Sequence, residues 1–181
     1  EPTYGFDKVI MLAGGVGYAR RSDAQKGTPE PGEEVVLLGG DNYRIGMGGG
    51  AVSSVNTGQY AGAIELNAVQ RSNPEMQKRV ENVIRTLSES EDNPIISIHD
   101  HGAGGHLNCL SELVETTGGH FDLSAFPIGD ETLSSKEIIG NESQERMGLL
   151  VKGDAVERIA RIAERERAPM YVVGRTTDDM H

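Results

Sequence analysis

The stretch Asn141-Glu142-Ser143-Gln144-Glu145-Arg146-Met147-Gly148-Leu149-Leu150-Val151 changes from polar to apolar near its midpoint. Its apolar part, Met147–Val151, predicts a strand buried on both faces, because a short continuous apolar run is typical of such strands. Its polar part, Asn141–Arg146, directly precedes that strand, where a polar run costs desolvation energy unless something binds there. Its carboxylates, hydroxyl, carboxamides and guanidinium can bind a polar small molecule. The alternative interpretation is a solvated loop.

A second polar group also follows an apolar run. Ile95–Ile98 predicts a strand, and His99–His101 and the glycine turn Gly102–Gly105 come directly after it. Between the two histidines, Asp100 offers a carboxylate beside a flexible turn. We take Asp100 as a candidate Mg²⁺ ligand, because Mg²⁺ prefers oxygen ligands and the phosphates of a nucleotide.

The histidines near Asp100 leave a distant alternative open, a zinc hydrolase built on His99, His101 and His106. A zinc site requires converging ligands from several side chains. For His101 and His106 we favour a polar turn residue and a helix-start residue over ligation. Cys109 lies in the same predicted helix as His106, and we expect a buried, inert thiol because no base accompanies it.

A glycine loop, Gly46–Ala51, contains the pattern G-x-G-x-x-A of dinucleotide-binding loops. We reject that function, since the pattern requires a strand directly before it and a helix directly after it. Asp41–Arg44 intervenes on one side, and Ser53–Gly58 is a poor helix on the other. The sequence also lacks G-K-[ST], the end of a Walker A loop. Two interpretations remain equal, a tight loop that needs positive φ and a phosphate loop whose backbone N–H groups bind an anion. The phosphate loop would use Gly46, Gly48, Gly49 and Gly50.

The remaining elements follow from apolar periodicity and capping signals. Asn73-Pro74 predicts a helix start, because Asn caps and Pro suits the first helical position, and apolar residues recur at helical spacing from Met76 to Leu87. We expect further strands at Val9–Leu12, Glu34–Leu38 and Met170–Val173, and further helices at about His106–Thr116, at Ser134–Ile139 and from an N-cap at Asp154 to Arg167. Strands that alternate with helices predict an α/β or α+β domain, with helices packed on a mixed sheet.

Composition narrows the class of protein. A chain of 181 residues suits one domain. The net charge of −11 argues against a nucleic-acid partner, which requires a basic face. No apolar run is long enough to predict a membrane span, and no signal peptide opens the chain. The single cysteine suits a reducing compartment, so we expect a cytoplasmic location. We interpret the chain, which begins at Glu1 without a methionine, as part of a longer one.

Together these pieces, in this order, resemble the phosphoribosylformylglycinamidine synthase family, in its long form with a fused glutaminase. The resemblance covers nearly the whole chain. It is carried by Ile10–Gly15, Gly46–Ser54, Ala68–Arg71, Asn73–Met76, His99-Asp100, Gly102–Gly105, Asn141–Arg146 and Arg165–Pro169.

The resemblance implies a fold and a place in a larger protein. Residues 1–181 would form a single subdomain of a much longer multidomain chain, the C-terminal half of its first aminoimidazole-ribonucleotide-synthetase-like unit. Its partners would be the rest of the same polypeptide: the N-terminal half-unit, a second synthetase-like unit and the glutaminase domain. Neither a nucleic acid nor a membrane is implied.

The resemblance also implies an activity, an ATP-dependent amidoligase that converts formylglycinamide ribonucleotide to formylglycinamidine ribonucleotide in purine biosynthesis, with Mg²⁺ and ATP as cofactors. Asp100 would bind Mg²⁺. The substrate contacts would be Gln70, Ser143, Gln144 and Glu145. His101 departs from the family pattern and receives no role. The catalytic histidine of the family has no counterpart here, so the isolated chain is expected to be inactive.

A non-catalytic alternative stays open beside this activity. The chain could be a nucleotide- or effector-binding module of the same superfamily, which includes selenophosphate synthetase and thiamine-monophosphate kinase. In that case the glycine loop and Asp100 would be structural. The run Asn141–Arg146 favours the purine enzyme, because it is the part of the resemblance associated with that enzyme.

Overall fold

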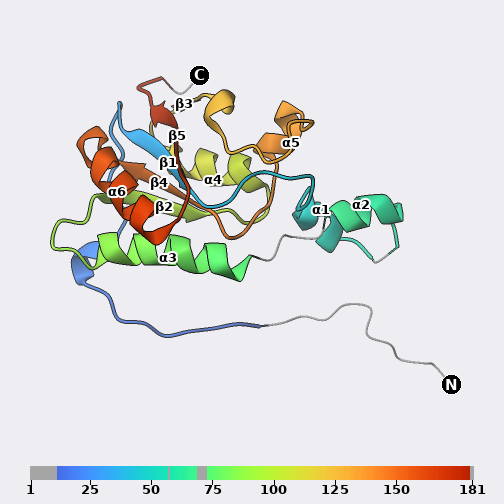
Figure 1. Ribbon diagram of the computed structural model, residues 1–181, viewed down its shortest axis with the longest axis horizontal. Coiled ribbons are helices and arrows are strands. Elements are labelled where there is room, and N and C mark those ends of the chain that lie inside the picture. Colours follow the sequence, from blue (N-terminus) through green and yellow to red (C-terminus); the bar gives the residue numbers. More distant parts are fainter. Residues whose placement is uncertain (1–11, 57, 69–72, 180–181) are drawn as a thin grey trace.

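The protein is described by a computed structural model that covers residues 12–56, 58–68 and 73–179. Its centre is a five-stranded sheet in the order β2-β4-β1-β5-β3 (Figure 1). The strands are β1 (Glu34–Leu38), β2 (Ile95–Asp100), β3 (Gly119–Phe121), β4 (Met147–Val151) and β5 (Met170–Thr176). The α-helices are α1 (Gly49–Ser53), α2 (Gly62–Asn67), α3 (Pro74–Ser88), α4 (Gly105–Leu113), α5 (Ser135–Ile139) and α6 (Val156–Glu166). Short 3-10 turns lie at Arg21–Asp23, Leu123–Ala125 and Gly153–Ala155.

Helices packed on a sheet are confirmed, but the expectation of a mixed sheet is wrong. Every neighbouring pair among the described strands is antiparallel. The reason is that two crossover units interleave. In the first, α3 connects β1 to β2, which run the same way with β4 between them. In the second, α6 connects β4 to β5, with β1 between them. The two strands of each unit are thus separated by a strand of the other unit, which runs in the opposite direction, as in split βαβ folds.

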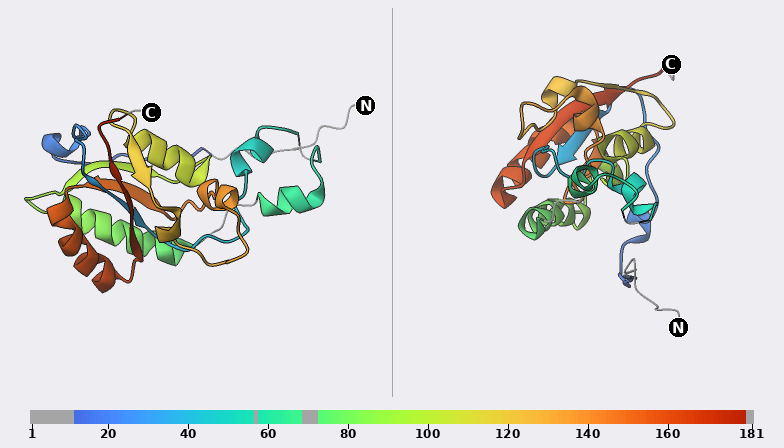
Figure 2. Two further views of the ribbon diagram at one scale, coloured as in Figure 1. Left: turned by 90° about the horizontal axis from the view of Figure 1, so that it is seen from above. Right: turned by 90° about the vertical axis from the view of Figure 1, so that its right-hand side faces the viewer.

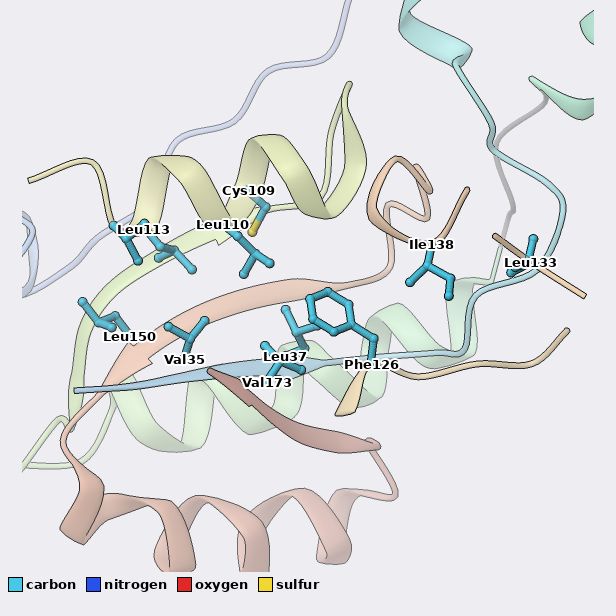
Figure 3. Close-up of a cluster of buried hydrophobic side chains, with 11 residues drawn as sticks. Val35, Leu37, Cys109, Leu110, Leu113, Phe126, Leu133, Ile138, Leu150 and Val173 are labelled. Atoms are coloured by element: carbon cyan, nitrogen blue, oxygen red, sulfur yellow. The ribbon is translucent and has the colours of Figure 1, made fainter. Parts of the chain in front are cut away.

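The two faces of the sheet carry separate hydrophobic cores because successive strand residues point to opposite faces. On one face, α3 and α6 pack against each other and cover Val36, Leu38, Leu149 and Val151. On the other face, α4 and the segment from β3 to α5 cover Val35, Leu37, Leu150 and Val173 (Figures 2 and 3). The central strands β1 and β4 are therefore buried on both sides, as continuous apolar runs predict.

Apolar runs and capping residues predicted the positions of several strands and helices. The strands predicted at Glu34–Leu38 and Met147–Val151 have the predicted bounds. Asn73 caps α3 by accepting from the N–H of Met76 at 3.0 Å. The expected strand Val9–Leu12 lies outside the described residues except for Leu12, which is exposed and outside any strand.

The N-cap predicted at Asp154 is wrong. A 3-10 turn over Gly153–Ala155 precedes α6, and its Ala155 N–H donates to the carbonyl of Lys152 at 3.0 Å. Asp154 therefore lies inside this turn. The residue that precedes α6 is Ala155, which offers no side-chain cap.

The helices α1 and α2 extend away from the sheet, at the end where the chain leaves β1 (Figures 1 and 2). The helix α2 buries none of its residues. Its Ile64 and Leu66 are 50% and 72% exposed. The folded core of the described chain therefore lies in the sheet, in the helices α3, α4 and α6 and in the segment from β3 to α5, and not in α2.

A glycine in β4 sets how closely α4 approaches the sheet. A Cβ on Gly148 would lie 2.6 Å from the Sγ of Cys109 and 3.0 Å from a methyl group of Leu113. We expect Gly148→Ala to lower the free energy of unfolding by about 1–3 kcal/mol, since overpacking a close contact forces the neighbours to shift. Gly153→Ala is the matched control, because a Cβ there meets nothing closer than 3.9 Å. Urea unfolding of both variants tests the prediction, and equal stabilities would contradict it.

Candidate functional site

The candidate site lies where three loops meet at one edge of the sheet. In the sheet register, Met147 at the start of β4 is opposite both Leu38 at the end of β1 and Asp100 at the end of β2. The loop after β1, the loop after β2 and the run Asn141–Arg146 before β4 therefore begin or end side by side (Figure 1). The two polar groups singled out in the sequence are thus neighbours in space.

The run Asn141–Arg146 is mostly internal rather than a solvated loop. Five of its six side chains are buried, and only Gln144 is exposed. The N–H of Arg146 donates to the carbonyl of Ser143 at 3.2 Å, which closes a turn with Gln144 and Glu145 at its centre. Ser143 donates its hydroxyl to the Oδ1 of Asn141 at 2.8 Å. The exposed carboxamide of Gln144 therefore stands on a turn whose flanking residues are held from inside.

The guanidinium of Arg146 is fully buried, and all three of its nitrogens donate hydrogen bonds. Nη1 donates to the Oδ1 of Asn42 and, at 2.7 Å, to the Nε2 of His106. Nη2 donates to the carbonyl of Asn141 at 2.8 Å and to its Oδ1 at 2.7 Å. Nε donates to the carbonyl of Ser143 at 3.4 Å. A buried cation is tolerated only when it is bonded in this way, because leaving its donors unpaired would cost several kcal/mol.

His106 lies at the start of α4, as expected, and His101 directly follows β2, but both side chains are completely buried. The Nε2 of His101 lies 2.9 Å from the Nδ1 of His106, and the ring of His106 packs edge-on against Phe126. Burial and the Arg146 guanidinium lower the pKa of His101 to about 3. The same two causes hold the pKa of His106 well below its usual value. Both rings are therefore neutral, which nothing in the local sequence signalled.

The zinc site considered for the histidines does not form within the described chain. The Nδ1 of His99 lies 2.6 Å from a carboxylate oxygen of Glu112, and its Nε2 contacts Lys26. His101 and His106 pair with each other in the interior. Among the described residues, no group of three or more His, Cys, Asp or Glu side chains could hold a metal ion. Burial raises the pKa of Cys109 to about 12, as expected for an inert thiol.

The glycine loop is tied to the other two loops by a buried carboxylate. Glu142 accepts from the N–H of Gly50 at 3.0 Å and from the N–H of Gly104 at 3.1 Å. Gly46 and Gly48 have φ values of 74° and 71°, which favour glycine. A Cβ on Gly50 would lie 2.8 Å from that of Ala103. Positive φ and close approach thus account for these glycines, and the anion that the Gly50 N–H binds belongs to the chain itself.

The described residues that follow Ser53 in the stretch Ser53–Gly58 form no helix, as expected, but a short helix, α1, begins earlier, at Gly49. It is a single short helix that starts inside the glycine loop rather than in Ser53–Gly58. The other requirement of a dinucleotide loop stays unmet, since β1 ends at Leu38 and Asp41–Arg44 intervenes.

Two predicted site residues remain, Asp100 and Gln70. The Asp100 side chain is exposed at the edge of the sheet, next to the turn that carries Gly104. Its carboxylate suits Mg²⁺ as a single protein ligand, because Mg²⁺ often takes only one or two carboxylates and fills its shell with water and phosphate oxygens. Gln70 lies outside the described residues.

Comparison with known proteins identifies the family. The sequence profile "AIR synthase related protein, C-terminal domain" matches residues 30–181. The chain belongs to this family. The chain is also 45% identical over 168 residues to a probable phosphoribosylformylglycinamidine synthase, chloroplastic/mitochondrial, of Arabidopsis thaliana. It is 44% identical over 174 residues to the human phosphoribosylformylglycinamidine synthase.

A solved structure agrees with these relatives. T. maritima PurL complexed with FGAR is similar to the AIR synthase related domain with a TM-score of 0.76 and 28% identity. The match covers 84% of this chain and 25% of that one. The plant and human alignments cover 92% and 95% of this chain but only 12% and 13% of those relatives. The domain is thus similar to one part of much longer enzymes. Within the residues described here, no helix is long and apolar enough to cross a bilayer.

The buried histidines predict how stability depends on pH. The folded-state pKa of His106 lies below its unfolded value of about 6.5, so the unfolded chain takes up the proton first as the pH falls. We expect the free energy of unfolding to fall between about pH 6.5 and 5, by up to about 1.4 kcal/mol per pH unit for each such histidine.

His106→Gln removes one of these titrating groups and should make that dependence shallower. The matched control is His120→Gln, at an exposed position on β3. Thermal unfolding of the three proteins over this pH range provides the measurement. An unchanged slope in His106→Gln would show that this ring is not held neutral by the fold.

Proposed function

We propose that the chain is the part of a phosphoribosylformylglycinamidine synthase that contacts the ribonucleotide and Mg²⁺. The whole reaction would be the ATP-dependent conversion of formylglycinamide ribonucleotide to formylglycinamidine ribonucleotide. The observation that carries the proposal is the meeting of Asp100 with the turn of Gln144 across the β2–β4 pair. The identities of 44% and 45% to synthases and the similarity to a PurL complexed with FGAR support the same assignment.

Within the turn, Gln144 is the residue proposed to reach the ribonucleotide with its side chain. Its carboxamide is exposed and offers both a donor and an acceptor. Ser143 and Glu145 are also proposed contacts. Because their side chains are buried, we propose that they contact the ribonucleotide through the backbone of the turn. Gln70 completes the proposed set by resemblance.

Asp100 is the proposed protein ligand of Mg²⁺. When bound, Mg²⁺ would neutralise negative charge on the phosphates of ATP. The task of this chain is then to hold the Asp100 carboxylate at the edge of the sheet, opposite Met147, which follows the turn that carries Gln144. The rigid pairing of β2 with β4 supports this, since sites on strands are held more precisely than sites on loops.

The proposed partners are the other parts of the same polypeptide, namely an N-terminal half-unit, a second synthetase-like unit and a glutaminase domain. The relatives are about eight times longer than the aligned region, which supports a multidomain protein. The proposed location is the cytoplasm, although one relative is named as chloroplastic/mitochondrial.

Removing the charge of Asp100 tests the metal assignment. We expect Asp100→Asn in the full-length protein to lower amidoligase turnover by at least about tenfold and to raise the Mg²⁺ concentration needed for half activity, because a neutral amide is a weaker ligand. Glutaminase activity should persist. The control is Asp154→Asn, an equally exposed aspartate beyond the opposite end of β4. An unchanged Mg²⁺ requirement in Asp100→Asn would remove this residue from the site.

The isolated chain should bind or position ligands without completing the reaction. The proposed activity requires a catalytic histidine and a source of ammonia that the family places in other parts of the polypeptide. We therefore expect neither ADP nor amidine product when the pure chain is incubated with ATP, Mg²⁺, ammonia and the ribonucleotide. Product formation above the level of a buffer blank would contradict this.

A further inference from the structure

The turn that carries Gln144 has no hydrophobic anchor of its own. The backbone carbonyls of Asn141 and Ser143, which precede Gln144, both accept hydrogen bonds from the guanidinium of Arg146. The same arginine also donates its backbone N–H to Ser143, so one residue closes the turn twice. The guanidinium is therefore one of the groups that hold the turn and its exposed carboxamide in place.

The guanidinium is itself located by two side chains outside the run. Asn42, in the loop after β1, accepts from Nη1 and is fixed in turn by donating its Nδ2 to the carbonyl of Pro127 at 2.8 Å. His106, at the start of α4, accepts from the same Nη1 at 2.7 Å. These two acceptors belong to different layers of the fold. They fix the arginine against both the sheet edge and the helix.

The arginine also determines which nitrogen of His106 carries the proton. The Nε2 of His106 lies 3.1 Å from the Oδ1 of Asn42 and 2.7 Å from the Nη1 of Arg146. Because the nearer group, a guanidinium, has only donors, we assign Nε2 as its acceptor. The Nδ1 of His106 then carries the hydrogen and donates to the Nε2 of His101 at 2.9 Å. The neutral ring thus receives a hydrogen bond from Arg146 on one side and gives one to His101 on the other. A side chain without an acceptor at the Nε2 position would remove one of the acceptors that hold the guanidinium of Arg146.

We propose that His106 is a positioning residue for the ribonucleotide site, acting through Arg146 on the turn that presents Gln144. The inference rests on the proposed function, because it assumes that Gln144 contacts the ribonucleotide. His106 itself is fully buried and touches no ligand in this arrangement. Its effect is transmitted by a continuous chain of hydrogen bonds from α4 to the turn.

The test compares His106→Gln with His106→Asn in the full-length protein. The glutamine amide reaches the place of Nε2 and can still accept from Arg146, whereas the shorter asparagine amide reaches only the place of Nδ1. We expect His106→Asn to raise the KM for formylglycinamide ribonucleotide about tenfold, because a hydrogen bond to a charged group is lost. We expect His106→Gln to stay within about threefold of the unchanged enzyme. The KM for ATP should change little in either variant.

The outcomes separate positioning from general stability. If both variants leave the KM for the ribonucleotide unchanged, or raise the KM values for ribonucleotide and ATP together, the inference is wrong. His120→Asn, on the exposed β3, controls for loss of a histidine. Gln144→Ala tests the assumption itself. If it leaves the ribonucleotide KM unchanged, the proposed contact and the inference both fail. If it raises that KM while His106→Asn does not, only the positioning role fails.

Discussion

The pairing of β4 with both β1 and β2 is the constraint on which the rest of the structure depends. Its register puts Met147 opposite the last residue of β1 and the last residue of β2. Because β4 runs against both strands, its beginning meets their ends at one edge of the sheet. Three segments more than 30 residues apart in the chain are thereby brought to one edge by the packing of the sheet, since β1 and β4 are buried on both faces. The hydrophobic cores thus decide where a site can exist, although they contribute no chemistry to it.

Polar contacts then decide the shape of that edge. Loops beyond the ends of strands have backbone groups without ladder partners, and buried groups of this kind must be bonded. Arg146 supplies donors to the carbonyls of Asn141 and Ser143, while the Glu142 carboxylate accepts from Gly50 and Gly104. One long cationic and one long anionic side chain from a single short run therefore bind the surrounding loops from within. Removing either would leave several groups unpaired at once, which is why such networks are sensitive to single substitutions.

Features that depend on neighbouring residues could be predicted, and features that depend on distant pairing could not. The bounds of β1 and β4 and the Asn73 cap follow from local apolar runs and capping chemistry. The antiparallel sheet does not, because the pattern of strands and helices is the same whether crossover units stack or interleave. The sequence predicts His101 in a polar turn and His106 at a helix start, and no local signal shows that both are buried, because their partners, such as Arg146 at 40 positions from His106, are distant in the chain. For Asn141–Arg146, the desolvation cost predicts that something binds there. Most of the bonding partners belong to the chain rather than to a ligand.

This distribution of partners has a consequence for binding. A run that used all its polar groups on a ligand would have to be ordered when the ligand arrives, at a cost of about 0.5–1.5 kcal/mol for each side chain that becomes immobile. Here five of the six side chains are already buried, and the exposed Gln144 stands on a closed turn. Most side chains of the run are therefore already ordered in the folded chain. The cost of ordering side chains would then lower the affinity for a ligand that contacts Gln144 and the turn only slightly. The hydrogen bonds within the run and ligand binding by the run are thus compatible, because the buried side chains hold the exposed Gln144 in place.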